Sequence, residues 1–294
     1  MSAVPAAYLG VVLIWATTPL AIKWSGEGPG FLFGVTSRMV IGAVLAVGLA
    51  RLSGVRVWGR SGALPAYAAA GLGIFGAMLA SYWAAQRIPS GWISVLFGLS
   101  PILTGLVAPY CLRAPGLTPL RLIGALLGLA GLAVIFGRGG SMATGAPVGI
   151  AAVVLAATVH SLSAVCVKRF GKGIPPLAVV SGGLAVATPL FLLTWAAFDG
   201  AWPATLPARA AGSILYLGVM GSVVGFSLYY FVLGRVDAAK VALITLVTPV
   251  AALLLGHFLN GEPLTAAVWL GAGLVITGLA LFEFGDRWRR RRHG

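Results

Sequence analysis

The side chains best suited to binding a small molecule lie within long apolar runs of this sequence. Trp15 is near the middle of the run 4–22, and Arg38 is the only Arg or Lys well inside a run. His160 lies slightly past the middle of the run 147–167. A guanidinium can hold a carboxylate, an indole can stack on an apolar group, and an imidazole can exchange a proton near neutral pH. These three side chains could therefore bind both ends of an amphipathic molecule.

Each of these residues also has a structural explanation. Trp15 could fill space between helices, and Arg38 could extend to the outer surface or bind carbonyls at a helix end. His160 could be a hydrogen-bonded link between helices rather than a substrate contact or a proton relay. The hydroxyls of Thr18 and Ser163 could face a polar cavity, although Thr18 could instead bond back to its own helix. The sequence leaves both sets of explanations open.

Aromatic side chains gather near the ends of the apolar runs. Tyr82 and Trp92 fall near the end of the third run and the start of the fourth, and Tyr230 near the end of the eighth. An interfacial aromatic belt is one explanation; the other is that these residues, with Phe97, form walls or gates of a cavity. The candidate substrate-binding residues are Trp15, Thr18, Arg38, Tyr82, Trp92, Phe97, His160, Ser163 and Tyr230.

Pro101 and Pro249 lie near the middle of the fourth and ninth runs. Proline removes a backbone donor and frees the carbonyl four residues earlier, which bends a helix. Each proline could be a fixed bend or a hinge between inward-open and outward-open states, and we predict a hinge at both.

Acidic residues are absent from the middle of every run. The six acids fall in loops or at run ends, at Glu27, Asp199, Asp237, Glu262, Glu283 and Asp286. Because proton-driven pumps commonly use buried acids, this pattern favours facilitated or weakly coupled movement of a solute. His160 is then the remaining candidate for a proton relay.

The elements that would position these residues are membrane-spanning helices. The chain of 294 residues is 59% hydrophobic and 9% charged, whereas soluble proteins are about 45–50% apolar and about 25% charged. Apolar runs of about 20 residues without two-residue alternation predict helices that cross a bilayer. We predict an all-α integral membrane protein with ten spans, at 4–22, 31–50, 64–85, 91–111, 119–137, 147–167, 175–198, 210–233, 238–259 and 264–284.

Lys and Arg residues are distributed unequally between alternate loops. With the N-terminus inside, fifteen fall in inner loops and the C-terminal tail, and four fall in outer loops. The positive-inside rule then places both termini in the cytoplasm, and we expect the cytoplasmic (inner) membrane. The net charge of +14 comes from these scattered residues and does not indicate nucleic-acid binding.

The sequence also contains an internal repeat. Gly124 and Gly131 align with Gly271 and Gly278. At nearly the same offset Gly73 aligns with Gly221, Tyr82 with Tyr230, Arg87 with Arg235, and Pro101 with Pro249. We predict two halves, 1–143 and 144–294, of five spans each. Because five is odd, the second half must be inverted, a plan that recurs in secondary transporters.

Several short motifs in fixed order resemble one known family. They are Trp15–Pro19, Ser37–Arg38, Tyr82–Gly91, Val95–Pro101, Gly221–Phe226, Arg235–Ala239, Thr248–Pro249 and Gly261–Glu262. Over nearly its whole length the chain resembles the EamA-type branch of the drug/metabolite transporter superfamily. It departs from that pattern at Ala114–Gly116, where many relatives carry a Glu.

The resemblance implies a basket of helices around a central cavity, with the fifth and tenth spans at the periphery. It also implies export of amino acids, related metabolites or drugs by alternating access. Within the branch, the size and aromatic content of the chain resemble those of exporters of aromatic amino acids. We therefore expect a metabolite exporter. A multidrug exporter is the alternative, ranked second because no acid is available to bind a cationic drug.

Other classes of function find little support in the sequence. Cys111 and Cys166 match no metal-site or disulfide spacing, and neither a metalloprotease motif nor a nucleophile elbow occurs. We therefore expect no enzyme activity, no cofactor and no metal. The expected partners are a small-molecule substrate and the lipid bilayer, with the chain acting as a monomer or weak homodimer.

Overall fold

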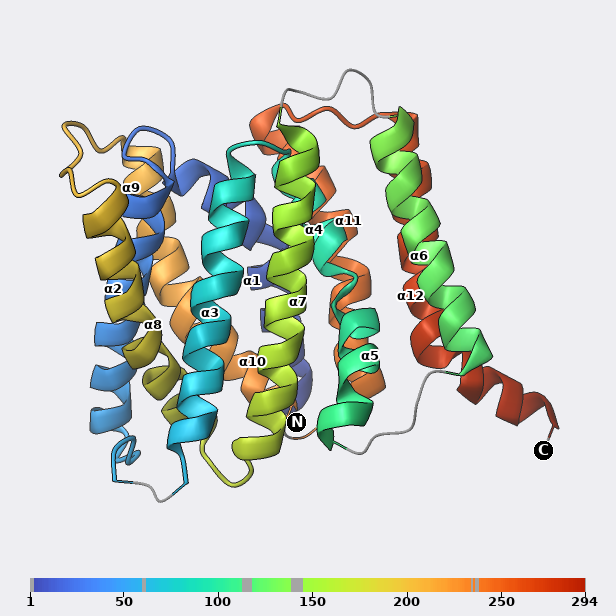
Figure 1. Cartoon of the computed structure of the whole chain (residues 1–294), viewed down its shortest axis with the longest axis horizontal. Coiled ribbons are helices and arrows are strands. Elements are labelled where there is room, and N and C mark those ends of the chain that lie inside the picture. Colours follow the sequence, from blue (N-terminus) through green and yellow to red (C-terminus); the bar gives the residue numbers. More distant parts are fainter. Residues whose placement is uncertain are drawn as a thin grey trace.

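Apolar helices make up nearly all of the described structure (Figure 1). The computed structural model describes residues 3–59, 62–112, 118–138, 145–233, 235 and 238–293. Within these ranges the chain forms helices joined by short loops, and no β-strand occurs. The predicted all-α class is therefore confirmed.

The helices reproduce the ten predicted spans. The first half contains α1 (Ala3–Ser25), α2 (Phe31–Leu52), α3 (Leu64–Ala85), α4 (Ser90–Phe97), α5 (Ser100–Leu112) and α6 (Pro119–Arg138). The second contains α7 (Ala146–Phe170), α8 (Pro176–Phe198), α9 (Ala208–Tyr216), the π-helix η1 (Leu217–Val224), α10 (Gly225–Leu233), α11 (Ala238–Asn260) and α12 (Ala266–His293). The fourth span consists of α4 and α5, and the eighth consists of α9, η1 and α10.

Length and surface both fit a bilayer. Seven helical segments of the described chain are long and apolar enough to cross a membrane, and three further apolar segments are shorter, at Pro119–Ile135, Thr248–Asn260 and Ala266–Phe282. Large apolar side chains point outward, and Leu13, Leu72 and Leu270 are each more than half exposed. Such a surface suits hydrocarbon, in which helices satisfy their own backbone groups. The chain is therefore a multi-pass integral membrane protein.

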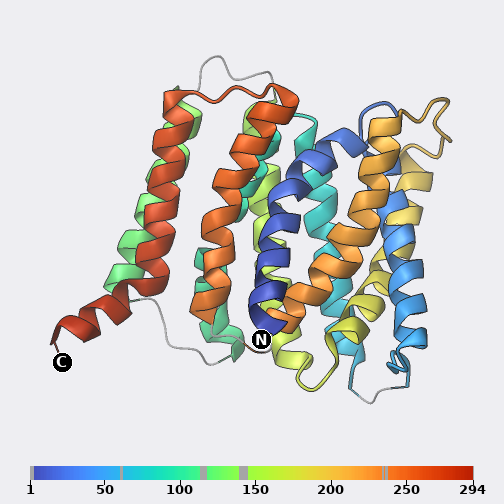
Figure 2. The ribbon, with the colours of Figure 1, turned by 180° about the vertical axis from the view of Figure 1, so that it is seen from behind.

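Successive spans run in alternating directions between two sides of the bundle (Figures 1 and 2). The N-terminal side contains the start of α1 and the C-terminal end of α12. The opposite side contains the loops 26–30, 86–89, 199–207 and 261–265. Because α1 begins on the N-terminal side and α7 begins on the opposite side, the second five spans are inverted relative to the first.

The pair α6 and α12 lies at the edge of the bundle (Figure 2). Glycines allow the close approach, because a side chain at Gly124 would overlap the backbone of Gly278, and one at Gly131 would overlap that of Gly271. Gly124 and Gly131 are the repeat equivalents of Gly271 and Gly278. The two glycine contacts are therefore repeat equivalents of each other. They are related by the pseudo-twofold symmetry of the inverted halves.

Two spans depart from a regular α-helix near mid-membrane. The fourth span is interrupted at Gly98 and Leu99, just before Pro101, and the Leu99 amide donates to the Leu96 carbonyl three residues back, at 3.0 Å. The eighth span contains η1, and π-helical turns occur frequently at functional sites. Pro249 lies within the continuous helix α11. The hinge role of either proline stays a prediction.

Candidate functional site

A cavity of about 400 Å³ lies inside the bundle. It extends from Ile22 and Ile93, near the opposite side, to Ala108 and Lys168, near the N-terminal side. Every span except α8 contributes a described lining residue. Its volume is within the range of about 300–1,000 Å³ that is typical of small-molecule sites. The predicted residues that line it are Trp15, Thr18, Arg38, Phe97, Pro101 and His160.

Four rings from four helices surround one part of the cavity. His160 on α7 lies 6.3 Å from Trp15 on α1, 6.0 Å from Phe97 on α4 and 6.3 Å from Tyr229 on α10, measured between ring centroids. Trp15 and Tyr229 lie 4.9 Å apart at an interplanar angle of 35°. We call Trp15, Phe97, His160 and Tyr229 the aromatic cluster. Such an arrangement can hold an apolar or aromatic group by stacking and edge contacts.

Arg38 brings a positive charge into the interior of the bundle. Its side chain is only 1% exposed, and its Nε donates to Ser222 Oγ at 3.0 Å. Nη1 lies 3.7 Å from the sulfur of Met78, and Cζ lies 6.0 Å from the centre of the Tyr82 ring. Snorkelling to the surface, one of the explanations that the sequence left open, is therefore not what this side chain does.

Neither of the ion pairs among the described residues includes Arg38. An uncompensated buried charge costs several kcal/mol after relaxation, so an anion bound beside the guanidinium would be strongly stabilised. Nη2 makes no hydrogen bond to a described residue, and Arg38 lines the cavity. The guanidinium therefore has donors free for a carboxylate.

The π-helix η1 provides the space that Arg38 occupies. Ser222 on η1 accepts the hydrogen bond from Nε, and an added Cβ at Gly221 would lie 3.1 Å from Nη2. A larger residue at position 221 would therefore press on the guanidinium. Glycine at this position and serine at the next together fix where the charge is presented.

The polar groups around the aromatic cluster are only partly engaged. Thr18 lines the cavity while its Oγ1 donates to the Ile14 carbonyl at 2.6 Å, so both sequence-based explanations hold for this residue. His160 makes no hydrogen bond to a described residue, and its ring lines the cavity. Thr18 Oγ1 can therefore still accept a hydrogen bond from a solute, and the His160 ring can take part in one.

The N-terminal end of the cavity carries two further basic residues. Lys168 on α7 and Arg121 on α6 both line it, and the Arg121 guanidinium lies 5.7 Å from the ring centre of Phe282 on α12. No Asp or Glu occurs among its described lining residues. The cavity is therefore apolar in its walls and positive in its charged groups.

Several predicted residues lie just outside this cavity. Ser163 and Tyr230 line a small adjoining pocket, where Ser163 Oγ donates to the Ala69 carbonyl at 2.8 Å. Tyr82 is fully buried and Trp92 is 7% exposed, so neither belongs to an interfacial belt. Tyr82 lies beside Arg38, and neither it nor Trp92 nor Pro249 lines the cavity.

Sequence reasoning missed several lining residues. Met78, Arg121, Lys168, Phe226 and Phe282 all contribute to the wall. Met78, Phe226 and Phe282 are ordinary apolar residues within apolar runs, so no feature of the sequence distinguished them. Arg121 and Lys168 were counted among the inner-loop residues, yet each lies within a terminal turn of its helix, where a long basic side chain can turn into the cavity.

Comparison with known proteins matches this architecture to one family. The sequence profile of the EamA-like transporter family matches residues 3–137 and again residues 147–284. The chain belongs to the EamA-like transporter family. The two matched segments lie within the predicted halves 1–143 and 144–294, and the protein is a membrane transporter.

The relatives agree with a transport role. The chain is 28% identical over 284 residues to a "Probable terminal-alkyne amino-acid exporter" of Streptantibioticus cattleyicolor, covering 95% of this chain and 93% of that protein. It is 28% identical over 277 residues to the "Aromatic amino acid exporter YddG" of Ancylobacter novellus, covering 92% and 93%. A solved structure described only as "Crystal structure of protein" superposes over 100% of both chains with a TM-score of 0.70 at 24% identity, which shows the fold.

Proposed function

We propose that this transporter exports amphipathic carboxylates, and aromatic or other bulky amino acids in particular, by alternating access. Arg38 holds the carboxylate, and the aromatic cluster holds the apolar side chain. Thr18 and His160 offer hydrogen bonds to the remaining polar group. Relatives named as exporters of amino acids support the substrate class.

The observation that carries this proposal is Arg38, buried to 1% exposure, facing a cavity and without a carboxylate partner among the described residues. Intramembrane ionisable residues mark substrate pathways because their burial is costly. A substrate carboxylate provides the missing negative charge. The ring of that substrate then extends toward Trp15 and Tyr229, which lie 4.9 Å apart in the same cavity.

The proposed orientation places both termini in the cytoplasm of an inner-membrane protein. Its support is the excess of Lys and Arg on the N-terminal side. In this orientation the structure is inward-open, because Lys168 at the N-terminal end of the cavity is exposed, whereas Ile22 and Ile93 at the other end are each 2% exposed. One chain surrounds the cavity, so we take the monomer as the transport unit.

We further propose that transport is facilitated or only weakly coupled to protons. No acid occurs among the described lining residues, and proton-driven pumps commonly use one. A pH-sensitive dye inside sealed proteoliposomes tests this directly. Substrate-driven proton movement at a fixed small ratio would contradict it.

Uptake of labelled phenylalanine into proteoliposomes tests the substrate class. We expect 3-phenylpropionate, which keeps the carboxylate, to compete, and phenethylamine, which lacks it, to compete weakly. Arg38→Gln should raise KM about thirtyfold, since loss of one partner of a buried charged pair costs about 2 kcal/mol or more. Arg51→Gln, at the exposed end of the same helix, is the matched control.

Two results would redirect the proposal. Wild-type KM for Arg38→Gln would remove Arg38 from substrate binding. Faster transport of a lipophilic cation such as ethidium than of any carboxylate would favour the multidrug exporter instead.

A further inference from the structure

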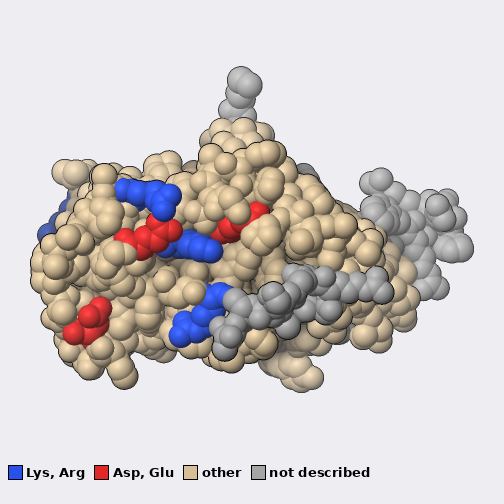
Figure 3. Space-filling model, turned by 90° about the horizontal axis from the view of Figure 1, so that it is seen from above, with Lys and Arg blue, Asp and Glu red and all other residues tan. Residues whose placement is uncertain are grey.

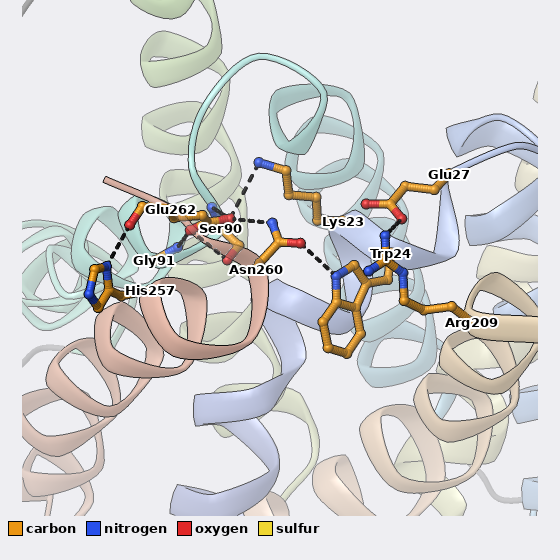
Figure 4. Close-up of polar contacts among 9 residues, drawn as sticks. All are labelled: Lys23, Trp24, Glu27, Ser90, Gly91, Arg209, His257, Asn260 and Glu262. Carbon is orange, nitrogen blue, oxygen red and sulfur yellow. Dashed lines mark hydrogen bonds and ion pairs between the residues drawn. The ribbon is translucent and has the colours of Figure 1, made fainter. Parts of the chain in front are cut away.

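The opposite side of the bundle is held together by polar contacts. Seen from this side, acidic and basic side chains lie near one another on a mostly uncharged surface (Figure 3). One group of contacts centres on Glu262, which follows α11 and is 8% exposed (Figure 4). We call Lys23, Ser90, Gly91, Asn260 and Glu262 the Glu262 cluster.

The Glu262 carboxylate accepts hydrogen bonds from every other member of the cluster. The amide and hydroxyl of Ser90 each donate at 3.0 Å, and the amide of Gly91 donates at 3.3 Å. Lys23 Nζ lies at 3.3 Å and Asn260 Nδ2 at 3.1 Å. Burial raises the pKa of this carboxyl, but the Ser90 and Gly91 donors and the Lys23 charge outweigh it, so the net pKa is lowered. The group is therefore a fully engaged anion.

These contacts join three helices at their ends. Lys23 is in the last turn of α1, and Ser90 and Gly91 begin α4. Asn260 ends α11, and Glu262 lies in the loop that follows it. Trp24 on α1 also donates through Nε1 to Asn260 Oδ1 at 2.9 Å. The carboxylate that caps the α4 N-terminus is thus supplied by a different span.

The same three helices form the cavity wall below the cluster. Ile22 of α1, Ser94 of α4 and Thr248 of α11 all line the cavity. Ser94 lies one turn of α4 beyond Ser90. The helix α4 is only eight residues long and ends at the break before Leu99. A contact at its N-terminus can therefore hold or release this short segment separately from α5.

The packing around Glu262 leaves it no room for a neighbouring side chain. A Cβ at Gly256 on α11 would overlap the Glu262 carboxylate and lie 3.2 Å from Ser90 Oγ. Glycine at position 256 thus permits the carboxylate to reach Ser90. This gives a way to displace Glu262 without changing a charge.

We propose that Glu262 is a positioning residue of the transport cycle, which closes the cavity toward the opposite side and must release Ser90 and Gly91 before that side opens. It acts on access to the site and touches no substrate. This inference rests on the proposed orientation only because that orientation identifies this side as the outer one. The role of Glu262 does not depend on which substrate is transported.

Side-specific cysteine labelling tests the proposal. Ser94→Cys is the reporter in a chain carrying Cys111→Ser and Cys166→Ser, and a membrane-impermeant thiol reagent is added to right-side-out vesicles. Ala201→Cys, in the exposed loop on the same side, sets the rate of unhindered labelling. In the parent we expect Ser94→Cys to react slowly from outside and rapidly in inside-out vesicles.

Release of Glu262 should change only the outer access. Glu262→Gln and Gly256→Ala should each speed outer labelling of Ser94→Cys about tenfold or more, because each weakens hydrogen bonds to a charged group. Glu27→Gln is the matched control, since Glu27 pairs with Arg209 on the same side at an exposed position, and it should leave the rate unchanged.

Several outcomes would overturn the proposal. One is parental labelling rates in both Glu262→Gln and Gly256→Ala; another is rapid outer labelling of the parent. If Glu262→Gln does not yield a monodisperse protein, Gly256→Ala and Lys23→Gln decide the question by the same readout. Since labelling needs no substrate, failure of the proposed amino-acid transport would leave this result unaffected.

Discussion

The two sides of the helical bundle close by different means. On the opposite side, the Glu262 cluster joins the ends of α1, α4 and α11. On the N-terminal side, the cavity reaches Lys168 and Arg121. The structure describes no acidic side chain on the N-terminal side. The acids whose side chains it does describe, Glu27, Asp199 and Glu262, all lie on the opposite side.

This difference indicates which contacts can set the equilibrium between the two conformational states of a transporter of this fold. The cavity walls are mostly apolar, whereas in the proposed role of Glu262 a few polar contacts at one end determine which side is closed. A change of a few kcal/mol at such contacts is enough to shift a two-state equilibrium. The short helix α4, broken from α5 at Gly98 and Leu99, is the element on which those contacts act.

Locking the closed side should have the largest effect. Trp24 and Asn260 are in hydrogen-bond contact across α1 and α11, so cysteines at both positions can be joined by a short, cleavable thiosulfonate linker. Transport should fall to background and return on reduction, because alternating access requires this side to open. The two single-cysteine chains treated with the same reagent are the controls. Undiminished transport by the linked protein would refute the comparison of the two sides.

Displacing Arg38 should have a smaller effect on transport than locking the closed side. Because Arg38 lies between the two sides, we expect the effect to be equal for transport in either direction. Gly221→Ala places a Cβ 3.1 Å from Nη2 and should raise KM for a carboxylate about threefold to tenfold, through loss of part of one charged hydrogen bond. Gly212→Ala, in the same span with open space around it, is the control. Equal KM values for the two variants would show that Gly221 does not position Arg38.

The basic residues at the open side should affect the rate of entry. Lys168→Gln should slow uptake of an anionic substrate from the N-terminal side by about twofold to fivefold at low salt, because charge at the mouth of a cleft steers a ligand. The effect should vanish at high salt. Initial rates at two ionic strengths, with exposed Lys172→Gln as the control, measure it. Salt-independent slowing would point to a packing defect.

Mild acidification should have the smallest effect on the closed side. The lowered pKa of Glu262 lies below the ordinary 4.5, so its hydrogen bonds are fully present above that value and are lost only as pH falls through the lowered one. Outer labelling of Ser94→Cys, relative to Ala201→Cys, should therefore not change between about pH 7.5 and about pH 5.5.

The neighbouring charges must be separated in that measurement. His257, whose Nδ1 lies 2.9 Å from the Glu262 carbonyl oxygen, is replaced in a His257→Gln background. Faster labelling at the lower pH in that background would show that Glu262 is not held as an anion.

Much of the fold could be predicted from composition and spacing. The ten apolar runs predicted the spans, and the uneven Lys and Arg content of alternate loops predicted their directions. The repeat of Gly124 and Gly131 at Gly271 and Gly278 predicted the inversion of the second half. Backbone hydrogen bonding in hydrocarbon leaves few alternatives to helices. The π-helix η1 could not be predicted, because no local residue pattern distinguishes it from the α-helix around it.

The site was only partly predictable. Trp15, Arg38 and His160 stood out because polar or bulky groups are rare at mid-membrane, and all three line the cavity. Tyr82 and Trp92 suggested the membrane interface because they lie near run ends, whereas packing of neighbouring spans buries both. Glu262 was recognised only as part of a short motif, since its role depends on Ser90 and Gly91, far away in the sequence.

A structure of the protein with 4-bromophenylalanine bound is the most direct test of the transport site. We predict anomalous scattering from bromine within the aromatic cluster and the carboxylate within hydrogen-bond distance of Arg38. Bromine outside the bundle, or a cavity filled by its own side chains with Arg38 paired to an acid of the chain, would contradict it.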